Sequence, residues 1–359
     1  MDSLPAIPPA RLAAHACIRS IEAGLPSTGA ASHSPLLQIL QTVHRIEHDP
    51  AVAGNLWVIN DRADSASEVV SPWGIWFRQQ APSRERPLIY LTQSPSSARV
   101  SMLAEQIGHR GIVFNDLESA ASRWPKGAHP WLPLWLSANA QCRPYDPASA
   151  AEAQAILLAA LDELYVQGRQ GFYYMTLHDQ PPAADEPAHD DCSDAFLGMY
   201  PLQPTSAARP QVRLLGAGAM LREVRAAAVL LDTHWGIASQ LWSCPSYTRL
   251  ARDSDDAARW NRLHPEAAPR KSYLQYCLMS ASTPVIAVTG YAQHIADQLA
   301  PHVTAPFTAL GADSLAPGNC LDRRWITFSA LQALAGQGLF DTQALPAAQA
   351  RLGLAACRT

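Results

Sequence analysis

A run of potential metal ligands lies between two β-rich parts of the chain. Its members are histidines, carboxylates and one cysteine: His178, Asp179, Asp185, Glu186, His189, Asp190, Asp191 and Cys192. Imidazole, carboxylate and thiolate groups bind zinc and related metals, but a metal site needs fixed spacing on regular elements. Here the side chains fall in a stretch broken by prolines, which favours a solvated acidic linker. We therefore expect no metal.

A glycine-containing turn, Gly216-Ala217-Gly218, follows an apolar strand and precedes a helical pattern. A turn of this kind can hold a phosphate at the start of a helix. The third glycine of the dinucleotide fingerprint is absent, and no acidic residue follows at the expected strand end. The sequence therefore favours a tight strand-to-helix turn without a bound nucleotide.

Two further groups of reactive residue types have structural interpretations. Cys244 has no histidine close to it in the sequence, so we do not expect a nucleophile there. The charges over 253–262 alternate at helical spacing, which predicts an exposed helix face with ion pairs. This second group is Asp253, Asp255, Asp256, Arg259 and Arg262.

Composition limits the possible functions. The 359 residues suit two domains. Hydrophobic residues make up 48% of the chain, which is enough for full cores. A net charge of −4 gives no case for nucleic acid or an anionic membrane as partner. No apolar run approaches the roughly 18 residues of a membrane span, and no signal peptide is recognisable. The seven widely spaced cysteines are typical of reduced thiols, so we expect a cytoplasmic protein. The 29 prolines and the alanine-rich background indicate a bacterial source.

An alternation of strands and helices predicts the fold class. Residues 1–30 are rich in Pro, Ala, Ser and Gly and are expected to form a poorly ordered arm. Apolar patterns then predict strands near 55–59, 87–91, 111–114, 171–177, 212–216, 237–243 and 285–289, and helices near 36–46, 100–107, 147–164, 220–231 and 325–334. Residues 247–262 are expected to form a helix or a turn region. This order is typical of an α/β protein with mostly parallel sheets and helices on both faces.

Four patches of sequence, in the same order along the chain, resemble one enzyme family. The most specific is 211–265, which contains the strand–glycine–helix unit Arg213–Leu231 and QLWSCPSYTRLARDSDDAARWNRLHP at Gln240–Pro265. It resembles the C-terminal domain of the homodimeric pyruvate dehydrogenase decarboxylating component, a thiamine diphosphate enzyme. The other patches are Ser34–Arg78 with its Trp73-Gly74-Ile75 turn, Cys142–Ala155, and Asp322–Phe340.

The resemblance implies two transketolase-like domains. Residues 32–190 would form a shortened pyrimidine-binding-type domain, and 205–359 a transketolase C-terminal-type domain. A flexible arm over 1–31 would precede them, and a linker over 191–204 would join them.

The resemblance also shows which catalytic parts are changed. The family uses a Gly-Asp-Gly…Asn motif for magnesium and the diphosphate, and a glutamate that bonds the aminopyrimidine N1′. No Gly-Asp-Gly occurs here. The glutamate-bearing helix best matches Ala104–Gly111, which aligns Glu105 with the first acidic residue and His109 with the activating one. An imidazole cannot replace that carboxylate, and the block between Trp124 and Ala140 is much shorter than in the family.

These changes lead to a primary hypothesis and two alternatives. The first is an accessory or pseudoenzyme subunit related to the decarboxylating component of 2-oxo acid dehydrogenase, without cofactor when alone. It would form a homodimer, or a heteromer with a chain that carries the diphosphate-binding domain. The second is the active β-type half of a split enzyme that binds thiamine diphosphate and magnesium with its partner, with Glu105 and His109 near the pyrimidine. The third is a repurposed binding protein or enzyme with a different ligand. The sequence leaves open whether the chain is an enzyme.

Overall fold

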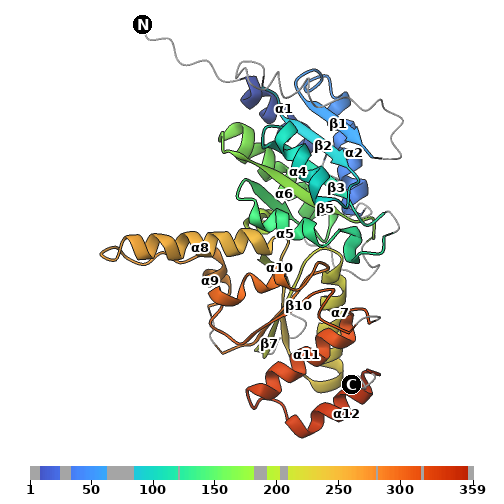
Figure 1. Ribbon diagram of the computed structural model, residues 1–359, viewed down its shortest axis with the longest axis vertical. Coiled ribbons are helices and arrows are strands. Elements are labelled where there is room, and N and C mark those ends of the chain that lie inside the picture. The colour runs from blue at the N-terminus through green and yellow to red at the C-terminus, as the bar shows by residue number, and fades with distance from the viewer. Residues whose placement is uncertain are drawn as a thin grey trace. The chain divides into compact units, whose positions relative to one another are not determined.

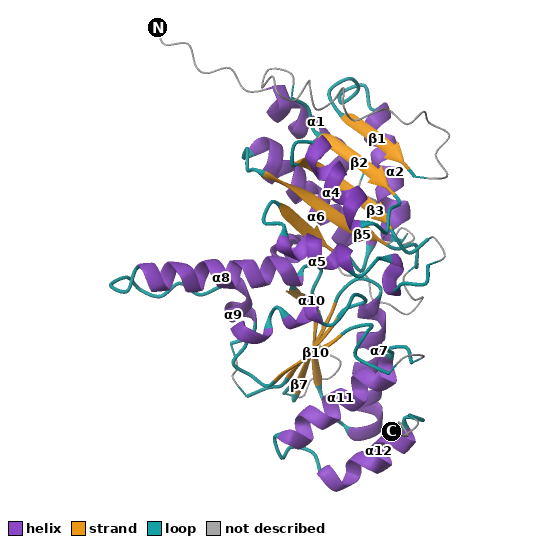
Figure 2. Ribbon diagram, in the orientation of Figure 1, coloured by secondary structure: helices purple, strands orange, loops and turns teal. Residues whose placement is uncertain are grey.

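The protein consists of two compact units, unit 1 (Met1–Ser193) and unit 2 (Asp194–Thr359) (Figure 1). The computed structural model describes residues 9–24, 34–62, 85–119, 122–181, 192–202, 209–279, 282–316 and 319–354. Each unit contains a mostly parallel sheet with helices packed on it (Figure 2). The predicted α/β fold class with two such sheets is confirmed.

The sheet of unit 1 has five parallel strands in the order β1-β2-β3-β5-β4. The central strands β3 and β5 are apolar and buried along most of their length, as expected for strands covered on both faces. Because the strands run in the same direction, their carboxyl ends form one edge of the sheet. The strands are β1 (Trp57–Asp61), β2 (Leu88–Thr92), β3 (Arg110–Asp116), β4 (Cys142–Tyr145) and β5 (Gly171–Leu177).

Serine side chains begin several helices of unit 1. Ser34, Ser96 and Ser149 each accept a backbone N–H from the first turn of the helix that follows. The apolar run at Trp131–Leu136 is helical. The helix tolerates Pro133 because this residue lies in the first turn, where a backbone N–H would have no acceptor within the helix. The elements are α1 (Pro9–Ala23), α2 (Pro35–His48), α4 (Ser97–Gln106), the 3₁₀ turn η2 (Pro125–Gly127), α5 (Trp131–Ala138), α6 (Ala150–Leu161) and the π-turn η3 (Asp162–Val166).

The expectation of a poorly ordered arm at the start of the chain was wrong for helix α1. Its buried side chains Ala10, Ala13, Ala14, Cys17 and Ile21 recur at helical spacing, and the helix packs on α2, α6 and η3. Pro9 begins the helix, where proline is tolerated. Small apolar residues can form a packed stripe, so an alanine-rich composition does not by itself indicate disorder.

The sheet of unit 2 has the order β10-β9-β7-β8-β6, in which β6 alone pairs antiparallel. Strands β7 and β9 are fully buried, and one core cluster joins them to α8 (Tyr247–Leu263), α9 (Tyr273–Cys277) and α10 (His294–Asp297). The strands are β6 (Tyr200–Pro201), β7 (Val212–Gly216), β8 (Ser239–Ser243), β9 (Val285–Val288) and β10 (Phe307–Leu310).

Helices α7 and α11 of unit 2 pack on each other and on the sheet. Gly236 ends α7 in the left-handed conformation with φ 64°, as is common at helix C-termini. None of the described helices has both the length and the apolar composition that a membrane span requires. The elements are η4 (Ser193–Leu197), α7 (Met220–Trp235), α8 (Tyr247–Leu263), α9 (Tyr273–Cys277), α10 (His294–Asp297), η5 (Ala300–His302), α11 (Arg323–Gly336), η6 (Thr342–Ala344) and α12 (Leu345–Arg351).

Candidate functional site

The carboxyl edge of the parallel sheet in unit 1 gathers polar side chains from every strand. Ligands of open parallel α/β sheets bind at this edge, so it is the first place to look for a site. The residues at or just after the strand ends are Asp61 and Arg62 (β1), Ser94 (β2), Asn115, Asp116 and Glu118 (β3), Asp146 (β4), and His178 and Asp179 (β5).

A buried lysine lies at the centre of this edge. The Lys126 ammonium is 2.6 Å from Glu118 Oε1 and 2.8 Å from Asp146 Oδ1, and only 3% of its side chain is exposed. One cation thus joins the segment after β3 to the segment after β4. We call Lys126, Glu118, Asp146 and the neighbouring His178 the lysine centre.

The backbone that carries Lys126 is strained. Lys126 has φ 55° and Gly127 has φ 69°. Both values lie in the left-handed region that side chains other than glycine rarely adopt. A Cβ atom on Gly127 would overlap the Leu117 carbonyl oxygen, so this position requires glycine. Strain of this kind persists only where the surrounding structure imposes it, and it is concentrated at functional sites.

Burial and charge set the protonation states of the lysine centre. Burial alone would lower the pKa of Lys126, but Asp146 and Glu118 outweigh it and raise the pKa above its usual range. Burial raises the pKa of Asp146 to about 6, although Lys126 opposes the shift. Burial, and then the charge of Lys126, lower the pKa of His178 to about 4. At neutral pH His178 is therefore uncharged beside a charged lysine.

The other polar groups of the edge also bond to one another. Asn115 is fully buried, and its side-chain amide accepts from Ser94 N at 2.9 Å and donates to the Tyr174 hydroxyl at 2.8 Å. Asp116 pairs with Arg62 at 2.7 Å. Asp179 accepts from the Ser34 hydroxyl at 2.6 Å.

This pairing limits what the edge can do chemically. Asp61 pairs with Arg99, so each carboxylate named at the described edge has a cation or hydroxyl partner within unit 1. A carboxylate that must bond a cofactor nitrogen would first have to lose such a partner. The residues present therefore do not fit the role of a free carboxylate at the aminopyrimidine of thiamine diphosphate. They fit an ion-paired polar network, in which Asp146 Oδ2 and His178 Nε2 are buried without a hydrogen-bond partner among the described residues.

The predicted candidates Glu105 and His109 lie close to each other, but not at the carboxyl edge of the sheet. Glu105 Oε1 is 3.1 Å from His109 Nε2, and 73% of the Glu105 side chain is exposed. Helix α4 ends at Gln106 and β3 begins at Arg110, so the stretch that best matched a family helix is a helix end, a turn and a strand start. The pair therefore lies at the amino edge of the sheet. The catalytic role of these residues stays a prediction.

Most of the potential metal ligands of the acidic run lie outside the described residues. Those are Asp185, Glu186, His189, Asp190 and Asp191. Of the others, His178 belongs to the lysine centre and Asp179 bonds Ser34. Within the described ranges no group of three histidine, cysteine or acidic residues is placed to hold a metal ion. The predicted Trp73-Gly74-Ile75 turn also lies outside them.

The glycine turn of unit 2 has the structural role that the sequence favoured. A Cβ on Gly216 would lie 2.9 Å from Leu221 Cα, so glycine allows helix α7 to pack close to strand β7. Gly218 has φ 52° and makes the turn. Cys244 follows β8 and is buried.

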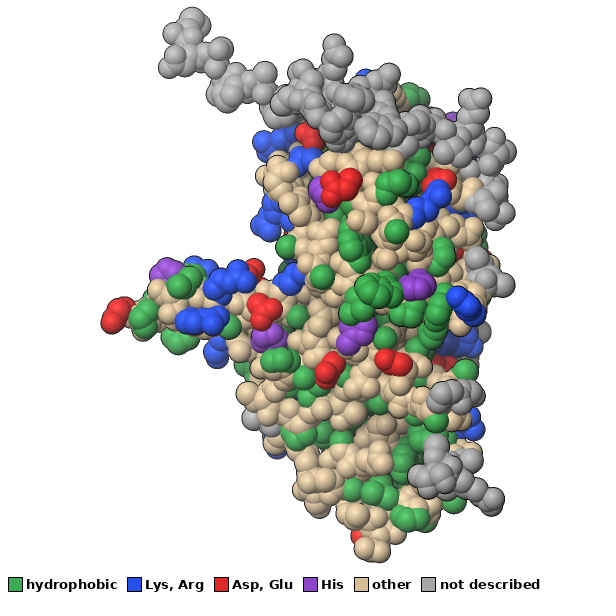
Figure 3. Space-filling view, viewed as in Figure 1, with side chains coloured by type: hydrophobic (Ala, Val, Ile, Leu, Met, Phe, Trp, Pro, Cys, Tyr) green, Lys and Arg blue, Asp and Glu red, His purple; other side chains and the backbone are tan. Residues whose placement is uncertain are grey.

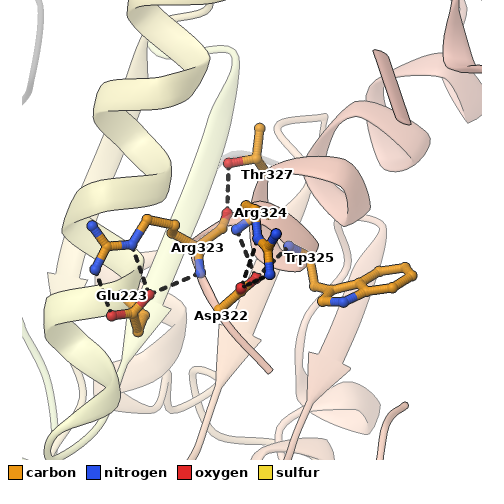
Figure 4. A network of polar contacts seen from close by, with 6 residues as sticks. All are labelled: Glu223, Asp322, Arg323, Arg324, Trp325 and Thr327. Atoms are coloured by element: carbon orange, nitrogen blue, oxygen red, sulfur yellow. Dashed lines mark hydrogen bonds and ion pairs between the residues drawn. The ribbon is translucent and has the colours of Figure 1, made fainter. Parts of the chain in front are cut away.

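An ion pair holds the start of α7 to the start of α11 (Figure 4). The Glu223 carboxylate accepts from Arg323 Nε at 2.9 Å, from Nη2 at 2.8 Å and from the Arg323 backbone N–H at 2.9 Å. Asp322 caps α11 by accepting from the N–H groups of Arg324 and Trp325. Side-chain contacts thus fasten two helix starts together, and the sequence alone did not predict this pairing.

Sequence reasoning missed the lysine centre. The chain has two lysines, Lys126 and Lys271, so a lone lysine in a Pro-Lys-Gly turn is an unusual feature of this arginine-rich sequence. That was the available signal. The carboxylates that pair with Lys126, Glu118 and Asp146, are eight and twenty residues away in the sequence. They follow different strands, and only the tertiary structure brings them to the lysine.

Comparisons with known proteins agree with this fold. The family model for the transketolase-like C-terminal domain matches residues 198–314. The pyruvate dehydrogenase E1 component of Cupriavidus necator is 36% identical over 222 residues, 57% of this chain and 24% of that protein. Over that part, this chain is similar to pyruvate dehydrogenase E1 components. The E1 component of Pseudomonas aeruginosa is 34% identical over 62% of the chain. The chain spans about a quarter of the length of these curated relatives.

Solved structures show the same fold at lower identity. Transketolase from Leishmania mexicana has a TM-score of 0.55 at 14% identity and covers 95% of this chain. A structure titled "Split gene transketolase, inactive beta4 tetramer" has a TM-score of 0.51 at 12% identity, and the match covers 98% of that chain. Both units therefore have the fold of transketolase domains, as the E1 resemblance predicted.

Proposed function

We propose that this chain is an accessory or pseudoenzyme subunit related to the decarboxylating component of 2-oxo acid dehydrogenase, without independent thiamine catalysis. The observation that carries the proposal is the pairing of the carboxylates at the carboxyl edge of unit 1. There the carboxylates are bonded to Lys126, Arg62, Arg99 and Ser34. The sequence similarity to pyruvate dehydrogenase E1 supports an E1-type chain as the partner.

Thiamine diphosphate supplies a carbanion that attacks the 2-oxo acid, and the protein must keep a carboxylate at N1′ to form it. At pH 7 His178 is neutral and buried, and Lys126 holds its proton between two anions. These groups stabilise the fold instead of moving protons. The residues of unit 1 would then shape a surface for a partner that carries the cofactor.

A second candidate is the β-type half of a split enzyme. Its support is the match to the chain of a split-gene transketolase, of nearly the same extent as this chain. In that arrangement a partner would bring the diphosphate-binding domain. Thiamine diphosphate and magnesium would then bind only to the pair, and Glu105 and His109 would be candidates at the pyrimidine.

Calorimetry with thiamine diphosphate and magnesium separates the two candidates. The isolated chain should bind neither tightly, and a mixture with an E1-type chain that carries Gly-Asp-Gly…Asn should turn over a 2-oxo acid no faster than that partner alone. Micromolar binding by the isolated chain would contradict the proposal. Loss of decarboxylation by a reconstituted pair on His109→Ala would favour the split enzyme.

A further inference from the structure

Helix α2 carries two exposed histidines near its C-terminal end. His44 and His48 belong to the sequence His44-Arg45-Ile46-Glu47-His48. Their rings are in contact, with centroids 4.3 Å apart and planes tilted by 48°. On the face of the molecule that Figure 3 shows, histidine side chains lie apart from one another. Two histidine rings in contact are therefore a distinct feature of this helix.

The packing of α2 fixes the direction of both side chains. Ile39, Val43 and Ile46 belong to the buried face of the helix. His44 and His48 lie on the exposed face, and residues four apart on a helix are neighbours. Zinc proteins use two histidines at this spacing to hold one ion, and the order here, H-x-x-E-H, is one of the known zinc patterns.

A hydrogen bond to the backbone orients one imidazole. His48 Nδ1 lies 2.7 Å from the His44 carbonyl oxygen. A carbonyl oxygen only accepts, so Nδ1 carries the proton and the lone pair of the neutral ring lies on Nε2. Histidines that bind metals commonly donate their second ring N–H to a backbone carbonyl in this way. His48 is thus held in the tautomer that binds a metal ion through Nε2.

The neighbouring charges favour a cation at this pair. Glu47 and Asp49 flank His48 in the sequence. Arg45 lies between the two histidines in the sequence, but its guanidinium donates to backbone carbonyls at the end of α1. The arginine is therefore bonded to another helix, and two carboxylates remain next to the imidazoles.

We propose that His44 and His48 form a binding site for a divalent transition-metal ion of the class of Zn²⁺ and Cu²⁺. An imidazole nitrogen of His44 and Nε2 of His48 are the protein ligands. Water supplies the other positions, since the part of the chain that the structure describes places no third histidine, cysteine or acidic group to hold the ion. Catalytic zinc centres have three protein ligands, so this site binds metal reversibly and joins two turns of α2.

This site is separate from the lysine centre. At the start of α2, Leu36 N donates to the His178 carbonyl at 3.2 Å. His44 and His48 lie roughly 12–18 Å farther along the helix axis, at about 1.5 Å per residue. The site goes beyond the proposed function, and its metal binding is measured without thiamine diphosphate or a partner chain.

Calorimetric titration of the metal-free full chain with ZnCl₂ tests the site. His44→Ala and His48→Ala should each raise the dissociation constant for zinc about tenfold or more, because one imidazole alone cannot chelate the ion. Both positions are exposed and alanine favours helix, so we expect unchanged circular dichroism. The double variant should bind zinc no more weakly than the weaker single variant by more than about twofold, since either substitution already breaks the chelate.

His264 supplies a matched control. Its Nδ1 also donates to a backbone carbonyl, that of Trp260 at 2.9 Å, but its ring stacks on Trp260 instead of on a second histidine. His264→Ala should therefore change the dissociation constant for zinc by less than about twofold.

Chemical labelling locates the ion. Diethyl pyrocarbonate acylates an imidazole nitrogen through its lone pair, so a bound ion protects its ligands. Mass spectrometry of the natural protein should show that ZnCl₂ removes most of the labelling of His44 and His48 and leaves that of His264 unchanged. CuCl₂ should protect the pair at lower concentration than ZnCl₂, as the order of metal affinities requires.

The proposal fails if the natural protein binds no zinc, or if His44→Ala and His48→Ala leave the dissociation constant unchanged. Equal protection of His264 would show that zinc binds exposed histidines singly. Protection of His189, in the acidic run, without protection of His44 and His48 would assign the ion to another part of the chain and equally reject the proposed site.

Discussion

The lysine centre of unit 1 and the Glu223–Arg323 pair of unit 2 each join elements that are distant in sequence through ionic contacts of similar length. The Lys126 ammonium lies 2.6 Å and 2.8 Å from its two carboxylates, and Arg323 lies 2.8 Å from Glu223. Lys126 is 3% exposed, whereas the Arg323 side chain is 45% exposed. Water can replace a lost partner at the second site but not at the first, so similar distances carry very different energies.

The largest expected effect is the loss of the buried cation. Lys126→Met leaves Glu118 and Asp146 buried without a counter-charge, which should destabilise the protein by about 3–5 kcal/mol. Lys271→Met removes a lysine outside the core and should change stability by less than about 0.5 kcal/mol. Urea unfolding of both variants measures the difference.

A combined variant sharpens this prediction. Adding Glu118→Gln and Asp146→Asn to Lys126→Met removes the stranded charges and should recover much of the lost stability. If the combined variant is as unstable as Lys126→Met alone, packing of the lysine stem, and not its charge, holds the site together.

The strained turn beside the lysine should be the next most sensitive position. Gly127→Ala puts a side chain at positive φ and against the Leu117 carbonyl, and should cost about 2–4 kcal/mol. Gly236→Ala is the matched control, because Gly236 has φ 64° but nothing within 4 Å of the added Cβ. It should cost about 1 kcal/mol, the conformational part alone. Equal costs in thermal unfolding would show that the Leu117 overlap is relieved.

The pH dependence of stability tests the state of His178. The folded pKa is about 4 against 6.5 for the free side chain, so the unfolded state binds a proton first as the pH falls. His178 therefore costs about 2 kcal/mol of stability at pH 5 and almost nothing at pH 7.5. The destabilisation of His178→Gln, relative to the natural protein, should be smaller at pH 5 than at pH 7.5 by about that amount.

Asp146 acts in the opposite direction in part of this range. Its folded pKa, about 6, is above its usual value, so it favours folding at low pH and loses that contribution as the pH rises through 6. A pH series on Asp146→Asn measures its share. A His178→Gln difference that does not change between pH 7.5 and 5 would mean that His178 has the same pKa in the folded protein as in the unfolded chain.

The smallest effect is expected at the exposed pair. Glu223→Gln weakens the bonds to Arg323 but keeps the side-chain size, and should destabilise unit 2 by about 0.5–1 kcal/mol. The loss should shrink in about 1 M salt, because salt screens exposed charges. A loss of several kcal/mol of stability that does not change with salt would show that this pair behaves like the buried lysine centre.

Much of the fold could be predicted from the sequence because local patterns specify it. The spacing of Leu221, Val224, Ala228 and Leu231 predicted α7, and the GFYYMTL run predicted β5. Helix α1 was missed because its packed stripe is mostly alanine, which carries little periodic signal.

The site could not be predicted in the same way. Glu105 and His109 were chosen by resemblance, and the structure brings them together at the amino edge. The polar groups of the carboxyl edge come from five strands, and their pairing depends on strand order. Sequence spacing does not contain that order, so Lys126 had no visible partner before the sheet was known.

The pairing of α7 with α11 has a consequence for synthesis on the ribosome. Glu223 and Arg323 are 100 residues apart, and the Thr327 hydroxyl reaches the Ala227 carbonyl over the same separation. At about 5–20 residues per second, α7 emerges roughly 5–20 s before the helix that covers it. Its apolar face, with Val224 and Leu231, is exposed to chaperones or to neighbouring nascent chains during that interval. The synthesis of α11 therefore determines when the apolar face of α7 becomes covered.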